Sequence, residues 1–247
     1  MNNSLLTRKN INMNILLGFM IIFSLAGFIY VNRSVGTDTP SYINIFDKCL
    51  DVERDFFDIE PGFWFFNRFV RNFTSEYRVL FFLMYLIVAF YTCKSIYAFR
   101  HQFSVIFSVI IYFSLFFLQS LSLARMYMAT SFVLISTVFL YQDKKVKSLI
   151  FLIFSCLLHY SCIIMFFSWL AYVLQFNRKL YVSFFAVVMI FVYGGFLTKV
   201  LELFPRYKLY LDLIGVSDRV GVMFYIKSLP LAFLLFQVKD VFSKKEF

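Results

Sequence analysis

The sequence predicts an all-α, polytopic membrane protein of about 6–7 transmembrane helices. Three observations predict it: 61% of the 247 residues are hydrophobic, only 15% are charged, and long apolar runs alternate with short polar tracts. An ordinary soluble domain contains about 25% charged residues. We therefore expect residues 1–247 to form a single integral membrane domain.

Except for residues 148–174, each apolar run that could cross the bilayer has close to the roughly 20 residues that a spanning helix needs. Basic tracts such as "TRK" and "DKKVK" lie between these runs, and positively charged loops remain in the cytoplasm. The N-terminus is therefore expected inside, and the net charge of +10 indicates anchoring rather than binding to nucleic acid. The candidate spans are residues 14–31, 79–99, 103–121, 126–141, 148–174, 180–198 and 222–238.

The run 148–174 is too long for one straight crossing. Its 27 residues would form a helix of about 40 Å, against a hydrocarbon core of about 30 Å. One long tilted helix and a re-entrant hairpin of two half-length helices both fit. Each alternative places five later Lys or Arg residues inside. We favour the hairpin because only this topology puts residues 199–221 and 32–78 on the same side.

Segments 32–78 and 199–221 are too polar to span and are expected to be external loops. The first holds eight of the fourteen acidic residues. Its stretch "FFDIEPGFWFFNRFVRNF" combines aromatics with arginines, which is typical of a helix lying in the membrane interface.

The stretch "VGTDTPSY" within the first loop predicts the start of a helix. Gly36 permits a tight turn, Asp38 or Thr39 can cap the helix, and Pro40 fits the first turn. Tyr42 would then lie on the same face as the aromatic residue four positions later.

Two ionisable residues stand out inside the apolar part of the chain. Arg125 has no acidic residue within about a dozen positions, and a charge at this depth needs a partner. It is either an anchor to the outer headgroups or a clamp for a diphosphate, to which the planar guanidinium is suited. His159 is either a packing residue or, with the nearby Ser161, a group that binds substrate or moves a proton.

The four cysteines show neither a CxxC pair nor metal-ligand spacing, and the acids form no DxD pair. We therefore expect no disulfide framework, no metal and no other cofactor.

The order of these motifs resembles the Wzy/EpsG-type bacterial polysaccharide polymerases. The similarity runs from about residue 30 to about residue 212. Two departures are visible: Met126 stands where the family usually has Gln after its Arg, and family members commonly carry further spans at the C-terminus. The matching motifs are Arg33-x-x-Gly36-Thr37-Asp38-x-x-x-Tyr42, Glu60-Pro61-Gly62-Phe63, "SLARMYMA", "LLHYSC" and "FPRYKLYLD".

The resemblance implies a multi-pass, metal-independent glycosyltransferase of the bacterial inner (cytoplasmic) membrane. Such enzymes join oligosaccharide repeat units carried on polyprenyl pyrophosphate at the outer face, alongside a flippase and a chain-length regulator. The alternatives are a ligase that transfers finished glycan to a different acceptor, a transporter or flippase for lipid-linked glycan, and a non-catalytic partner of an assembly system.

Residue chemistry and resemblance together predict the site residues. The catalytic candidates are Arg125, Asp38, Glu60 and His159. The substrate-binding candidates are Arg33, Gly36, Tyr42, Ser161, Arg206, Tyr207 and Tyr210.

Overall fold

A computed structural model describes residues 2–32, 38–51 and 59–174, together with Ser183 and Val187. The chain divides into two units, Met1–Asn177 and Arg178–Phe247, and the contacts reported below lie within the first. The predicted single membrane domain stays a prediction. The expected spans 180–198 and 222–238 and the loop 199–221 lie outside the described residues.

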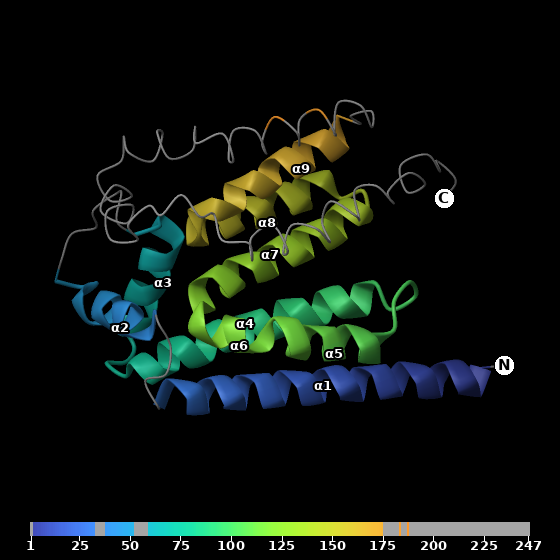
Figure 1. Cartoon of the computed structure of the whole chain (residues 1–247), viewed down its shortest axis with the longest axis horizontal. Coiled ribbons are helices and arrows are strands. Elements are labelled where there is room, and N and C mark those ends of the chain that lie inside the picture. Colours follow the sequence, from blue (N-terminus) through green and yellow to red (C-terminus); the bar gives the residue numbers. More distant parts are fainter. Residues whose placement is uncertain (1, 33–37, 52–58, 175–182, 184–186, 188–247) are drawn as a thin grey trace, which may run out of the picture. The chain divides into compact units, whose positions relative to one another are not determined.

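Every regular element in the described residues is a helix, which confirms the all-α fold class (Figure 1). A short 3₁₀ turn, Tyr160–Ile163, separates the last two helices. The helices are α1 (Asn2–Asn32), α2 (Thr39–Lys48), α3 (Pro61–Arg71), α4 (Tyr77–Ala98), α5 (Val105–Leu115), α6 (Phe117–Ser122), α7 (Ala124–Tyr141), α8 (Lys145–Leu158) and α9 (Ile164–Val173).

Two of the described helices, α4 and α7, are long and apolar enough to cross a membrane. Their 22 and 18 residues correspond to about 33 Å and 27 Å. Shorter apolar stretches lie at Met13–Gly27 and Val105–Leu115. The total number of crossings stays a prediction.

The expectation of one continuous helix over 103–121 is wrong. Helix α5 ends at Leu115, and the separate helix α6 begins at Phe117. Tertiary contacts account for the break: the Phe117 ring packs on Phe23 at 5.6 Å, and the Tyr85 hydroxyl donates to the Leu121 carbonyl at 2.9 Å. These contacts hold α6 against α1 and α4.

The long run 148–174 forms two helices, as in the hairpin alternative. His159, directly after α8, has extended backbone with φ −156° and ψ 116°. The 3₁₀ turn follows, and α9 then runs back beside α8 (Figure 1). One continuous tilted helix is therefore excluded, while the position of the hairpin in the bilayer stays a prediction.

The first polar loop contains the two helices that its motifs predict. Asp38 is the N-cap residue of α2, and Tyr42 is buried as expected. The Asp38 carboxylate makes no capping hydrogen bond; it accepts one from the Tyr42 hydroxyl at 3.2 Å.

Helix α3 is amphipathic, with one face in the core and the other exposed. Phe63 and Val70 are buried, whereas Phe65 and Phe69 are exposed. This division is compatible with the predicted interfacial helix, whose placement at the membrane stays a prediction.

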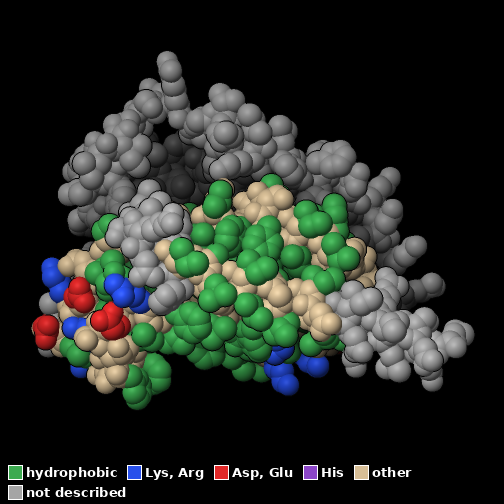
Figure 2. Space-filling view, turned by 90° about the horizontal axis from the view of Figure 1, so that it is seen from below, with side chains coloured by type: hydrophobic (Ala, Val, Ile, Leu, Met, Phe, Trp, Pro, Cys, Tyr) green, Lys and Arg blue, Asp and Glu red, His purple; other side chains and the backbone are tan. Residues whose placement is uncertain are grey.

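The core is continuous from α1 through α4 and α7 to α8, each helix packing on the next. Phe23, Tyr85, Met128 and Leu152 are among its fully buried side chains. Figure 2 shows a broad band of hydrophobic side chains; charged side chains of both signs gather at the end where Figure 1 draws α2, and further Lys or Arg side chains lie along the lower edge of the view. Such a distribution is typical of helices whose flanks contact lipid rather than water.

Helix α1 approaches α4 closely at Gly27. A Cβ atom at this position would overlap the ring of Tyr85, whereas one at Gly18 would meet nothing within 4 Å. The Tyr85 ring is fully buried and held by its hydrogen bond to Leu121, so it has little freedom to move.

We therefore expect Gly27→Ala to destabilise the protein by about 1–3 kcal/mol through overpacking. Gly18→Ala on the same helix is the matched control, and it should be neutral or stabilise by up to about 1 kcal/mol. Thermal unfolding of the detergent-solubilised proteins measures both changes. Equal melting temperatures for the two variants would contradict this account of the α1 and α4 contact.

Candidate functional site

Three residues far apart in the sequence meet around one buried carboxylate. Glu60 is the N-cap residue of α3, Arg125 lies in the first turn of α7, and His159 directly follows α8. The Arg125 Nη1 group donates to Glu60 Oε2 in a salt bridge. His159 Nδ1 lies 2.9 Å from Glu60 Oε1. Glu60 is only 6% exposed, so each carboxylate oxygen has a partner inside the protein.

The environment of Glu60 keeps its carboxyl group ionised. Burial raises the pKa of Glu60. The hydrogen bond from His159 and the charge of Arg125 lower this pKa by more than burial raises it, so it lies below its ordinary value of 4.5. An ionised carboxylate can only accept hydrogen bonds, so His159 must carry a proton on Nδ1. In a neutral imidazole with its proton on Nδ1, the lone pair lies on Nε2. The His159 side chain is 24% exposed, so its imidazole ring can be reached from the protein surface.

Two aromatic rings lie beside the guanidinium group of Arg125. Its guanidinium lies over the rings of Phe63 and Tyr42, at 5.3 Å and 5.8 Å from their centroids. These distances are within the range of cation–π attraction. Burial and the neighbouring Asp38 charge raise the pKa of Tyr42, so its hydroxyl stays protonated and donates to Asp38. Asp38 is thus connected to the cluster through one aromatic ring.

Gly62 allows α3 to lie directly against α8. A Cβ atom at this position would lie 2.8 Å from the Leu157 carbonyl oxygen and 2.9 Å from Leu157 Cβ. Only glycine permits this approach without a shift of backbone. The sequence indicated Gly62 as a turn former, but its role is to bring the N-terminal end of α3, and with it Glu60, close to His159.

The structure therefore brings the four catalytic candidates together, three directly and Asp38 through Tyr42. Ser161 lies in the 3₁₀ turn with an exposed side chain and is not among the described contacts of the cluster. The remaining substrate-binding candidates lie outside the described residues: Arg33, Gly36, Arg206, Tyr207 and Tyr210.

Two contributors were missed as site residues in the sequence. Phe63 supports the guanidinium and Gly62 sets the helix approach, although both belong to the quoted "EPGF" motif. Among the described residues, no group of three or more His, Cys, Asp or Glu side chains could hold a metal ion. The expected metal independence stays a prediction.

Comparison with protein families gives one match relevant to this site. The sequence model of the EpsG family matches residues 15–247, a range that includes Glu60, Arg125 and His159. Comparisons with curated proteins and with solved structures gave no match. Since the matched range covers nearly the whole of the 247 residues, the chain belongs to the EpsG family.

Proposed function

We propose that this protein is a polysaccharide polymerase of the bacterial inner membrane, acting at its outer face on oligosaccharide repeat units linked to polyprenyl pyrophosphate. The family indicates a function related to polysaccharide polymerisation. The observation that carries the proposal is the buried Glu60 carboxylate, which holds a cationic and a basic side chain at one place.

The proposed reaction is a glycosyl transfer. A hydroxyl group of the incoming repeat attacks the anomeric carbon of the growing chain. The bond from that carbon to the pyrophosphate oxygen breaks, and polyprenyl pyrophosphate leaves with the electron pair. The protein must accept the hydroxyl proton and stabilise negative charge on the leaving group.

His159 is the better candidate for the proton acceptor. Glu60 is buried, occupied on both oxygens and has a lowered pKa, which makes it a poor base. Asp38 already accepts from Tyr42. Among the described residues His159 Nε2 has no partner, while Glu60 holds the opposite nitrogen, an arrangement that orients an imidazole for general base catalysis. Glu60 is then a positioning residue.

Arg125 is the proposed contact for the leaving diphosphate. Its guanidinium has five N–H donors in a planar fork, and the salt bridge to Glu60 engages Nη1. Because Glu60 offsets the charge of Arg125, a diphosphate would need further cations. Arg33 and Arg206 are the candidates predicted from the sequence.

A transporter for lipid-linked glycan is less well supported. Charged residues lining a cavity among the helices would favour that function. The cavity between α4, α5 and α7 has no Lys, Arg, His, Asp or Glu among its lining residues.

Replacing Arg125 by Ala should abolish the polymer ladder in a gel of surface glycan from cells that depend on this protein. Removing one group that stabilises transition-state charge typically costs about 10²–10³ in rate. Arg125→Lys should give little more polymer than Arg125→Ala, since lysine lacks the planar guanidinium fork. Arg78→Ala, at an exposed arginine on α4, is the matched control. A normal ladder from Arg125→Ala at equal membrane abundance would favour a non-catalytic partner.

Gly62→Ala should also shorten or remove the ladder, because the added methyl group pushes α3 and Glu60 away from α8. A misplacement of about 1 Å near reacting groups can cost about 10²-fold. The double variant Gly62→Ala/Leu157→Ala should not recover, since the nearest obstacle is the Leu157 carbonyl oxygen. Full activity of Gly62→Ala would show that the spacing between α3 and α8 has no effect on polymerisation.

Acidification should remove the stability that Glu60 contributes. Its pKa in the folded chain is below 4.5, so this contribution is complete above pH 4.5 and is lost as the pH falls through the lower folded value. The difference in melting temperature between wild type and Glu60→Gln should therefore shrink as the pH falls below 4.5. A difference that widens below pH 4.5 would contradict the ionised carboxylate.

A further inference from the structure

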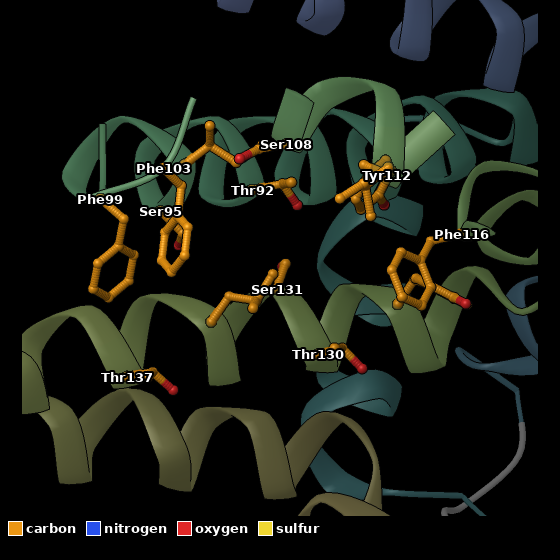
Figure 3. Close-up of a pocket in the computed structure, with 14 residues that line it drawn as sticks. Thr92, Ser95, Phe99, Phe103, Ser108, Tyr112, Phe116, Thr130, Ser131 and Thr137 are labelled. Carbon is orange, nitrogen blue, oxygen red and sulfur yellow. The ribbon is translucent and has the colours of Figure 1, made fainter. Parts of the chain in front are cut away.

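A groove of about 320 Å³ lies between α4, α5 and α7, away from the Glu60 cluster (Figure 3). Figure 3 shows Phe99 and Phe103 at one end of it and Tyr112 and Phe116 at the other. Phe103 is 63% exposed and Phe116 41% exposed, so the groove opens on the side of the helix bundle. Its volume is in the range of ligand sites.

The groove is chemically apolar although several hydroxyl-bearing residues line it. Five of the eight hydroxyl-bearing lining residues donate to a carbonyl three or four residues earlier: Ser95, Ser108, Thr130, Ser131 and Thr137. Tyr127 donates to the Gln119 side chain. The buried hydroxyls of Thr92 and Tyr112 have no hydrogen-bond partner among the described residues. Six of the eight hydroxyls therefore offer no free donor to an occupant.

The dimensions of the groove fit a single hydrocarbon chain. From Tyr127 to Thr137 it follows ten residues of α7, which corresponds to about 15 Å. This length is about half of the 30 Å hydrocarbon core, the depth of one leaflet. In a membrane protein, lipid chains are the apolar molecules present at high concentration beside such an opening.

Basic residues gather where the groove ends at Phe99 and Phe103. The α4–α5 turn and the α7–α8 turn are joined there, since the Phe99 and Tyr141 rings lie 5.3 Å apart and Gln102 donates to the Tyr141 hydroxyl. The two turns and the start of α8 carry four basic residues against one acid, Asp143. We call these four the basic collar: Arg100, Lys144, Lys145 and Lys147.

We propose that this groove and the basic collar form a binding site for an anionic phospholipid, with one acyl chain in the groove and the phosphate at the collar. The excess of positive charge at the mouth complements an anionic headgroup, and each nearby Lys or Arg contributes about 1 kcal/mol of attraction to an anionic surface. The collar includes the "DKKVK" tract expected in the cytoplasm, so the lipid belongs to the inner leaflet. The proposal does not depend on the proposed catalytic function.

The test is native mass spectrometry of the full-length protein with added phosphatidylglycerol or phosphatidylcholine carrying identical acyl chains. The wild type should bind phosphatidylglycerol at least about tenfold more tightly, which corresponds to roughly 1.4 kcal/mol. Ser108→Phe, which fills the groove, should weaken phosphatidylglycerol binding about tenfold, with Ile153→Phe on exposed α8 surface as its control. Glycerol phosphate, which has no acyl chain, should not compete.

The collar is tested separately with Lys144→Gln/Lys147→Gln, which should reduce phosphatidylglycerol binding to the phosphatidylcholine level. Lys48→Gln/Arg78→Gln removes the same charge elsewhere and should leave binding unchanged. Thermal unfolding establishes that each variant is folded. Equal binding of the two lipids by the wild type, or undiminished binding by folded Ser108→Phe, would overturn the proposal. Competition by glycerol phosphate would instead indicate a simple phosphate site and would also overturn it.

Discussion

The ionised carboxylate of Glu60 is the constraint on which the arrangement of the helix ends depends. A buried charge without partners costs several kcal/mol, and removing one member of such a pair typically costs about 3–5 kcal/mol. Glu60 therefore stabilises only those structures in which Arg125 and His159 are both within reach. Through this one side chain, the start of α3, the start of α7 and the end of α8 are held together.

The packing around the cluster makes those contacts possible. Gly62 removes the side chain that would separate α3 from Leu157, and His159 adopts an extended backbone that ends α8 beside Glu60. Continuation of α8 through this residue would carry the imidazole ring to a different place. The aromatic rings of Phe63 and Tyr42 shield the guanidinium from the side of α2 and α3.

The two sides of α7 have different surroundings. Its first turn supplies Arg125 to a compact cluster of paired polar groups, whereas Tyr127 to Thr137 line an apolar groove that ends at basic loops. Arg125 and Tyr127 are two residues apart and so point to nearly opposite sides of the helix. One helix thereby separates a polar site from a surface suited to hydrocarbon.

The sequence alone determined the all-α membrane class and the helix start at Asp38, because apolar length and turn residues are local properties. The four polar residues of the cluster were predicted from residue chemistry together with the resemblance to the polymerase family. The sequence could not determine which partner satisfies Arg125, since Glu60 is 65 positions away. Tertiary contacts also decided the break at Phe116, where Phe23 and Tyr85 hold α6, and the role of Gly62. Close approach of two backbones has no local sequence pattern, because it depends on the residue that faces the glycine from another helix.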